Sequence, residues 1–394
     1  WELQNEKIPH VIIPDNAGID ASGDQGGGTV LVGGDYQGRP VPSVSEGTSD
    51  IQNATVTFVG EDASIKADAK TAGDGGKVIV WADDVTRYYG SISARGGAEG
   101  GDGGFAEVSG KVSLDFAGMV DLRAPAGSVG ELLLDPKNII VSIADPGGGA
   151  VSRTLAADLD AFTDNPTEIS WITPVILVGL LDLADVTFRV NNDITFTDAV
   201  DTTIGNSSFT LEAGRSILVN AGITIGGNFT ATANIASTSV VEVNRDTASA
   251  GVFTMADATT ITTTDNGGNG NITIKVQTGD PDIAVAANKA SGDITLSNLN
   301  AGTGHVLVEQ GGATAGSDIL RTATSSITAA SVALDISNGA NTTGVIGASA
   351  NKINTTTANL ELRTQGGNAF LSETDGLIIG GATLGGLTGA NTGT

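Results

Sequence analysis

The sequence lacks cysteine altogether. A disulfide framework, a thiolate metal site and a cysteine nucleophile are therefore excluded. Histidine is almost absent as well: the only two, His10 and His305, lie so far apart in the chain that they suggest neither a catalytic triad nor a zinc site. We interpret both as surface or ladder residues, and we predict that the chain is not an enzyme and binds no cofactor.

Positive charge is also scarce. The chain has 19 lysine and arginine residues against 45 aspartate and glutamate residues, which gives a formal net charge of −26. Nucleic acids and anionic lipids would be repelled, because their affinity for proteins is largely electrostatic. Divalent cations and cationic surfaces remain open as partners.

Long apolar runs are missing too. No stretch reaches the roughly 18 apolar residues needed to span a bilayer. The longest, 171–183, is interrupted by Pro174 and Asp182. Residues 1–7 lack the charged and apolar regions of a signal peptide. We therefore expect a mature or internal piece of a longer protein, with no membrane span.

Aromatic residues make up only 4% of the chain, whereas glycine reaches 56 residues. This composition would indicate disorder if the apolar residues were scattered. They instead form short alternating runs, as at 186–190 and 272–276, bounded by Gly, Asn and Asp. Such runs are typical of many half-buried strands joined by tight turns.

Three series of these runs share a period of about 27 residues. The first aligns 27–32, 75–80, 103–108 and 129–134, the second aligns Ile19, Ile65, Ile92 and Val120, and the third aligns 85–89 with 112–116. Three strands per repeat, each stacked on its equivalent in the next repeat, predict an all-β, right-handed, triangular parallel β-helix. A propeller is disfavoured because the turns lack the repeated Asn-Gly or Asp-Gly signal of hairpins.

The spacing of the repeats predicts a long-rung β-helix over 1–136 with one insertion. The insertion, at 34–53, is expected to be a tolerated surface loop, or a loop that caps a groove or contacts a neighbour. Residues 137–185 break the pattern, and helical spacing at 156–162 and 172–181 predicts a covering loop with short helices.

A continued β-helix is predicted over 186–394, with shorter rungs of about 21 residues. This period comes from inward pairs that begin at Val186, Phe209, Phe229, Phe253, Ile272 and Ile294. The register beyond residue 296 stays open. We expect a subdomain boundary at the change of period.

Four phrases lie at residues 78–84 (VIVWADD), 91–97 (SISARGG), 101–110 (GDGGFAEVSG) and 132–136 (LLLDP). Together they resemble the filamentous-haemagglutinin-like exoproteins, adhesins that Gram-negative bacteria and cyanobacteria export by two-partner secretion. The resemblance implies a right-handed β-helix, an outer-membrane transporter as export partner, and a role in adhesion or biofilm at the cell surface or in the extracellular matrix. The Asn-Pro-Asn-Leu and Asn-Pro-Asn-Gly motifs of the family's secretion domain are absent, so the resemblance covers the β-helix portion only.

Two groups of acidic residues are candidate chemical sites. Asp83, Asp84 and Arg87 come nearest to the calcium-and-base arrangement of β-helical lyases, but adjacent aspartates on a strand point to opposite faces. Asp74 and Asp102 recur at one repeat and should lie one above the other, where a calcium ion or hydrogen bonds would relieve their repulsion. They are the only candidates for a metal site.

The candidates for contact with a partner are Tyr36, Arg39, Trp81, Tyr88 and Tyr89. The outward members of the group Trp81, Tyr88, Tyr89 and Phe105 could form a contact patch, with core packing or a ladder under the insertion as the alternative. The threonine run 259–264 could belong to a flat array that binds ice or glycans, or could simply suit an exposed strand.

Two functions follow from the sequence. The first is a stiff stalk or adhesin segment that presents loops to a glycan or a host-surface ligand. The second is a subunit of an extracellular filament, in which copies of the chain stack head to tail through open β-helix ends. The candidates for such ends are Val11, Ile12, Ile13, Leu384 and Leu387.

Overall fold

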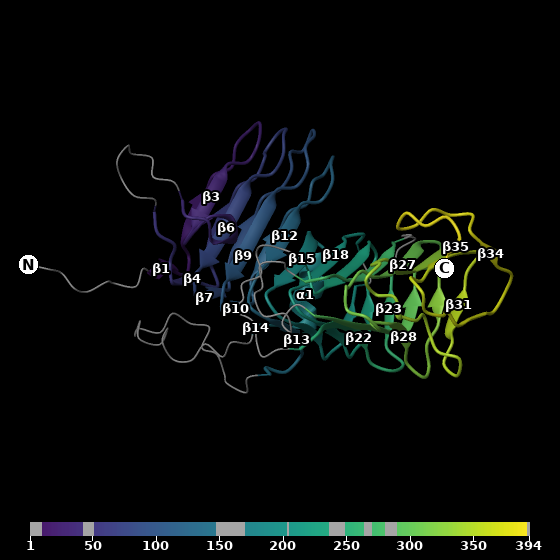
Figure 1. Cartoon of the computed structure of the whole chain (residues 1–394). Helices are drawn as coiled ribbons and strands as arrows, with labels where there is room; N and C mark the ends of the chain where they lie inside the picture. Colours follow the sequence, from purple (N-terminus) through teal and green to yellow (C-terminus); the bar gives the residue numbers. More distant parts are fainter. Residues whose placement is uncertain are drawn as a thin grey trace, which may run out of the picture. The chain divides into compact units, whose positions relative to one another are not determined.

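The computed structural model describes residues 10–41, 51–146, 170–202, 205–235, 249–263, 270–279 and 290–391. The chain folds into two compact units, Trp1–Thr187 and Phe188–Thr394. Strands dominate both units, and the named strands pair in parallel with strands one repeat away. The predicted parallel β-helix is therefore confirmed (Figure 1). Among the described residues, no helix is long and apolar enough to cross a membrane.

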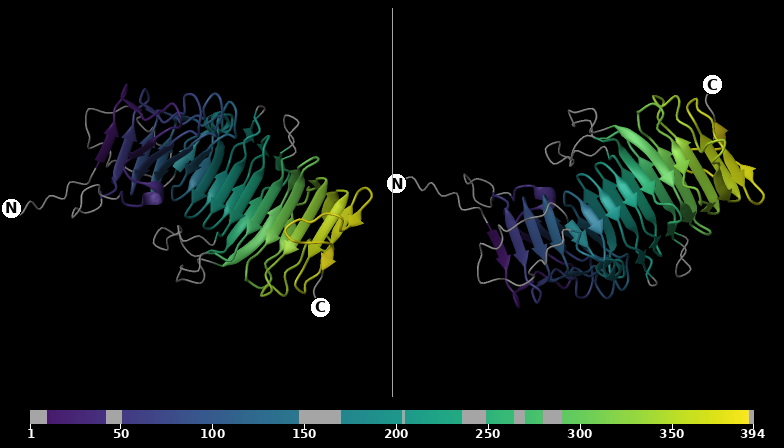
Figure 2. Two further views of the ribbon diagram at one scale, coloured as in Figure 1. Left: turned by 90° about the horizontal axis from the view of Figure 1, so that it is seen from above. Right: turned by 90° about the horizontal axis from the view of Figure 1, so that it is seen from below.

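Unit 1 contains three sheets. Its first sheet has the order β1 (His10–Ile13), β4 (Val56–Val59), β7 (Val85–Tyr88), β10 (Ser113–Phe116), β14 (Ser170–Ile172) and β13 (Ile139–Val141); its second sheet contains β2 (Gly18–Asp20), β5 (Ser64–Lys66), β8 (Ser91–Ser93) and β11 (Met119–Asp121); its third contains β3 (Thr29–Val32), β6 (Lys77–Ala82), β9 (Phe105–Gly110) and β12 (Glu131–Leu134). The chain visits the three sheets in turn, so each strand stacks on its equivalent from the previous repeat (Figure 2).

The predicted register is confirmed in two sheets of unit 1 and wrong in the other. Ile65 pairs with Ile92 in the second sheet, and Val78 pairs with Ala106 in the third, as expected. In the first sheet Tyr88, and not Tyr89, lies opposite Phe116. The predicted alignment was thus displaced by one residue, which exchanges inward and outward side chains.

The first part of the insertion after β3, residues 34–41, folds back over the third sheet. It begins with a short 3-10 turn, η1 (Tyr36–Gly38), and residues 34–41 are called the strap below. Val41 and Ile51 form an antiparallel bridge on either side of residues 42–50, which lie outside the described part.

One helix, α1 (Pro174–Leu181), follows β14 and packs on β11. Thr173 caps it by accepting a hydrogen bond from the Ile176 amide, and proline suits its first turn. The helix expected near 172–181 is thus confirmed, whereas 156–162 lies outside the described residues. β14 lies between β10 and β13, so here the order of strands departs from the order of the chain.

Unit 2 begins at Phe188, within β15 (Asp185–Val190). Its first sheet contains β16 (Ile194–Phe196), β19 (Ile217–Val219), β22 (Gly251–Met255), β25 (Ser291–Leu296) and β28 (Ile319–Arg321); its second contains β17 (Val200–Asp201), β20 (Ile223–Thr224), β23 (Thr260–Thr262), β26 (Asn298–Asn300), β29 (Ile327–Thr328), β31 (Ile353–Thr356) and β33 (Leu371–Glu373); its third contains β18 (Phe209–Ala213), β21 (Phe229–Ala233), β24 (Ile272–Val276), β27 (His305–Gln310), β30 (Ser331–Ile336), β32 (Asn359–Arg363), β34 (Ile378–Ile379) and β35 (Ala390–Asn391).

The predicted short, even period of this second half is wrong. Phe229 pairs with Ile272 in the third sheet, whereas Phe253 pairs with Ile217 in the first. The predicted series therefore mixed strands of two sheets, because both show the same alternating pattern. Hydrogen bonds between successive rungs join residues 22, 36 and 43 positions apart, so the rung length varies widely.

The interior is apolar along both units. In unit 2, Phe209 lies edge-on to Phe188 and Phe229, with ring centroids 5.1 and 6.3 Å away, and edge-on to Phe196 at 6.1 Å. These rings are fully buried. Stacked aromatic and aliphatic residues on the inner faces supply the hydrophobic stabilisation that no single repeat could obtain alone.

Candidate interaction surface

Four loops protrude from unit 1 between its second and third sheets. They comprise residues 21–28, 67–76, 94–104 and 122–130, and are called the turn comb below. A backbone hydrogen bond of 2.7–2.8 Å closes each loop, from Gly28 to Ala21, Gly76 to Ala67, Gly104 to Ala94 and Gly130 to Leu122. Figure 1 shows these loops as a row, coloured purple to blue.

Glycines at the base of the comb are required by the closeness of the rungs. A Cβ atom on Gly27, Gly75 or Gly103 would overlap a backbone carbonyl oxygen of the neighbouring loop. The amides of the same three glycines donate to carbonyl oxygens one rung further on, at 2.8–3.0 Å. Glycine is therefore required at these positions because the backbones of neighbouring loops stack too closely for a side chain.

The two calcium candidates lie in this comb, one above the other as predicted. The Asp74 carboxylate accepts a hydrogen bond of 2.8 Å from the Asp102 amide, and the Asp102 carboxylate accepts one of 2.7 Å from the Ser128 amide. Hydrogen bonds to the next rung thus satisfy an oxygen of each carboxylate. In the part of the chain that the structure describes, no three acidic or histidine side chains gather closely enough to hold a metal ion.

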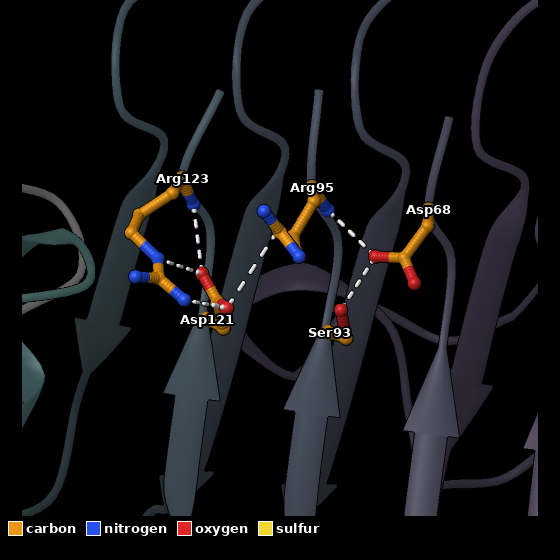
Figure 3. Close-up of polar contacts among 5 residues, drawn as sticks. All are labelled: Asp68, Ser93, Arg95, Asp121 and Arg123. Atoms are coloured by element: carbon orange, nitrogen blue, oxygen red, sulfur yellow. Dashed lines mark hydrogen bonds and ion pairs between the residues drawn. The ribbon is translucent and has the colours of Figure 1, made fainter. Parts of the chain in front are cut away.

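A charged ladder runs along the comb where it leaves the second sheet (Figure 3). Asp121 accepts two hydrogen bonds from the Arg123 guanidinium, at 2.9 and 2.7 Å, and lies 3.7 Å from the Arg95 Nε atom. Asp68, one rung before Arg95, accepts hydrogen bonds from the Ser93 hydroxyl and the Arg95 amide. The ladder therefore joins three successive rungs through side chains.

Asp121 makes the stability of this ladder dependent on pH. Burial raises the pKa of Asp121, but hydrogen bonds and charge from Arg123, with the charge of Arg95, lower it below its ordinary value. A lowered carboxyl pKa contributes stability that is present above the unfolded-state pKa and is lost as the pH falls through the folded-state pKa.

We therefore expect Asp121→Asn to weaken the acid dependence of unfolding. Between pH 7 and pH 3, the variant should lose less unfolding free energy than the native chain, by up to about 1 kcal/mol. Denaturant titrations at both pH values measure the difference, with the exposed Asp62→Asn as control. An unchanged pH dependence in the Asp121 variant would contradict this role.

The strap lies over the outer face of the third sheet in unit 1. The Tyr36 ring meets Phe105 edge-on at 5.7 Å, and Arg39 and Lys77 place their cations 5.5 and 5.6 Å from its centre. Lys77 also forms an ion pair of 3.0 Å with Asp35. An open groove of about 730 Å³ lies between the strap and the turn comb, lined by Tyr36, Lys77, Phe105, Asp74, Glu131 and comb glycines.

Two buried residues anchor the strap. The Glu107 carboxylate, wholly buried in β9, accepts a hydrogen bond from the backbone amide of Gln37, whose nitrogen lies 3.1 and 3.3 Å from the two carboxylate oxygens. Trp81 is 5% exposed and donates from Nε1 to Asp83 at 2.9 Å. A Cβ atom on Gly38 would press on the Trp81 ring, so the two are closely packed. Trp81 is therefore covered by the strap and cannot belong to an outward patch.

The two adjacent tyrosines are also buried. Tyr88 points inward and stacks on Phe116, with centroids 5.3 Å apart, and burial raises the pKa of its hydroxyl well above its usual value. Its hydroxyl has no hydrogen-bond partner among the described residues. Tyr89 lies on the outer side, edge-on to Phe58, and donates its hydroxyl hydrogen to Asp115. Of the five predicted contact residues, only Tyr36 and Arg39 remain accessible.

Tyr88→Phe and Tyr89→Phe should shift stability in opposite directions. Tyr88→Phe removes a desolvated hydroxyl that has no hydrogen-bond partner, and should stabilise the fold by about 1 kcal/mol. Tyr89→Phe leaves the Asp115 carboxylate without its hydroxyl donor, and should cost about 1–2 kcal/mol. Urea midpoints of the two variants measure the contrast. Shifts of the same sign would contradict the register of β7 against β10.

Unit 2 carries a second charged column, on the outer face of its third sheet. Lys275, Glu309, Asp335 and Arg363 follow one another in register. Lys275 lies 3.0 Å from Glu309, and Arg363 binds both oxygens of Asp335 at 2.7 Å. Burial raises the pKa of Asp335 above its usual value, although Arg363 acts in the opposite direction. The four charges of this column thus form two ion pairs.

The remaining predicted residues are dispersed. Asp83 bonds to Trp81 and Asn53, while Arg87 lies in β7 in register with Phe58 and Asp115, so these residues form no lyase-like centre with Asp84. His305 begins β27, where its amide donates to Asn271, and His10 begins β1. Both histidines therefore occupy strand positions.

The candidate end residues divide into two groups. Val11, Ile12 and Ile13 lie half-buried in β1, an outer strand of its sheet. Leu387 is buried and pairs with Leu384, and Gly385 between them abuts Leu307, so this segment lies across the side of the third sheet. The exposed apolar residues near that end are Leu377, Ile378 and Ile379, which sequence reasoning missed.

A scan against models of protein families finds no match for this chain, and no curated protein matches it.

Proposed function

We propose that the chain is a structural and adhesive β-solenoid of a bacterial cell surface, with no catalytic role. The observation that supports this proposal most is the way in which side chains join successive rungs. Asp74, Asp102, Asp121 and Asp335 all bind residues of a neighbouring rung. Such ladders favour a stiff body that presents loops, here the turn comb and the strap.

The four phrases that resemble haemagglutinin-like exoproteins support the same role. On that basis we propose export through an outer-membrane transporter and residence at the cell surface or in the extracellular matrix. The groove beside Tyr36 and Arg39 is a candidate contact for a glycan or host-surface ligand, because it combines an aromatic ring with accessible charged groups.

Attachment of cells to the purified chain tests the adhesive role. Beads coated with the folded chain should retain bacteria or host cells several-fold better than beads coated with an unrelated protein of equal negative charge. Unfolding the chain on the beads with urea should abolish the difference. Equal retention on both kinds of bead would overturn the adhesive proposal.

A filament subunit is the second candidate. Ile378 and Ile379 are 61% and 62% exposed on β34, an outer strand of the third sheet, where a second copy could cover them. Negative-stain images should then show fibres many molecules long, and Ile378→Lys with Ile379→Lys should shorten them. Images that show single molecules only would remove this alternative.

A further inference from the structure

The outer side of the second sheet in unit 2 is free of charge over five consecutive strands, β20, β23, β26, β29 and β31. Its outward positions are Gly222, Thr224, Thr260, Thr262, Asn298, Asn300, Ser326, Thr328, Asn354 and Thr356, named the threonine–asparagine face below. The alternate positions, such as Ile261 and Leu299, are buried in the interior. An uncharged face of this extent is unusual on a chain whose formal charge is −26.

The threonine hydroxyls of this face have no partner within the described protein. No side-chain hydrogen bond occurs at Thr224, Thr260, Thr262, Thr328 or Thr356, although all are partly accessible. By contrast, buried threonines elsewhere use their hydroxyls on backbone carbonyls, as Thr57, Thr86 and Thr263 do. The outward hydroxyls are therefore available to an external partner.

Asparagines hold the rows of the face in register. The Asn298 side chain accepts the Ser326 amide hydrogen at 3.1 Å, and Asn354 donates to the Ser325 carbonyl oxygen at 3.1 Å. Neighbouring strands of a sheet lie roughly 4.8 Å apart, and alternate residues of a strand roughly 6.6 Å apart. The hydroxyl and amide groups thus form a regular two-column lattice.

This chemistry disfavours a protein or an ionic ligand. Protein interfaces are anchored by aromatic or large aliphatic residues at a desolvated centre, and the face has none. An ionic partner would find no opposite charge on it, because the charged column of unit 2 lies on its third sheet. A partner with uncharged, repeating hydroxyl groups matches both the lattice and the absence of charge.

We propose that the threonine–asparagine face binds the surface of a neutral polysaccharide whose chains are packed in a regular array. Sugar hydroxyls would exchange hydrogen bonds with the threonine hydroxyls and asparagine amides, and the threonine methyl groups would contact the apolar faces of the sugar rings. This inference deepens the adhesive role proposed above and rests on it, but it assigns a surface distinct from the strap groove.

Co-sedimentation with microcrystalline cellulose tests the proposal on the full chain. The native protein should sediment with cellulose equally at low and high salt. Thr262→Lys with Thr328→Lys, which places two bulky charges on the face, should weaken partition by about tenfold or more. Thr230→Lys with Thr254→Lys is the matched control, because these half-exposed threonines lie on the third and first sheets; it should bind as the native chain does.

Four results would overturn the proposal: no sedimentation of the native chain, equal loss in both double variants while circular dichroism shows both folded, loss of binding in high salt, or thermal hysteresis of freezing without cellulose binding, which would assign the face to ice. The bead assay separates this failure from failure of the adhesive role. Cells retained equally by the native chain and the Thr262/Thr328 variant would leave adhesion intact and place it elsewhere.

Discussion

Replacing Gly103 with alanine should destabilise unit 1 by about 4 kcal/mol or more. A Cβ atom at this position would overlap the Leu122 carbonyl oxygen and the Gly130 amide nitrogen, both of which belong to backbone that cannot move without separating the rungs. The Gly103 amide also donates to Ser128 in the next loop. The substitution therefore disrupts stacking across two loops of the comb. Thermal unfolding followed by circular dichroism measures the loss.

Gly179→Ala is the control for this substitution. Gly179 lies within α1, where a Cβ atom would meet nothing within 4 Å. Alanine should stabilise the helix by up to about 1 kcal/mol, because glycine loses more conformational freedom on folding. If Gly103→Ala and Gly179→Ala left the melting temperature equally unchanged, close stacking of the comb would be ruled out.

Phe209→Ala should cost unit 2 about 3–5 kcal/mol. Phe209 is fully buried in β18 and contacts the rings of Phe188, Phe196 and Phe229, so its removal leaves a cavity and ends three aromatic contacts. Thr210→Ala, at the half-exposed neighbouring position, should change stability by less than about 0.5 kcal/mol.

Denaturant titration of Phe209→Ala and Thr210→Ala compares their losses of unfolding free energy. A loss at Thr210 equal to that at Phe209 would contradict the assignment of Phe209 to the interior and Thr210 to the outer face. Such a result would also reverse the inward and outward assignments of β18 as a whole, because side chains alternate along a strand.

The fold class and most of the unit 1 register follow from sequence because two signals repeat there together. Gly-Gly pairs are needed where backbones approach, and apolar pairs such as Val78 and Val80 follow them directly. The strands of the first sheet are not preceded by a Gly-Gly pair. Val112 therefore aligned with Val85 by similarity alone, although the structure pairs Val85 with Ser113.

In unit 2 the same reasoning failed for a physical reason. The rungs contain corners of very different lengths, and a corner of any length can join strands that still stack. Phe253 and Phe229 both begin inward pairs, yet they belong to different sheets. Alternation identifies a strand and its buried side, but it does not say which sheet the strand joins.

The candidate surface was the least predictable feature. Its ladders depend on pairs such as Arg95 with Asp121, which become neighbours only once the register is known. Glu107 offered no signal of its own, because a charged residue in a strand usually faces solvent, whereas this one is wholly buried and binds the strap. The threonine run at 259–264 did point to the outward lattice, although just part of that lattice lies within the run.

Engineered cysteine pairs test the central claim, parallel stacking in the observed register, most directly. The chain has no cysteine of its own, so a disulfide can form only between the introduced residues. Thr230 and Thr273 are register partners on adjacent strands of the third sheet. The Cα atoms of such partners lie roughly 4.8 Å apart, within the range that a disulfide spans.

Mild oxidation followed by mass spectrometry of the peptides identifies the bond. Thr230→Cys with Thr273→Cys should form a disulfide nearly quantitatively in the folded chain. Thr230→Cys with Thr254→Cys, the pair implied by an even period of short rungs, should remain reduced because Thr254 lies in the first sheet. A disulfide in the second pair and none in the first would contradict the stacking described for unit 2.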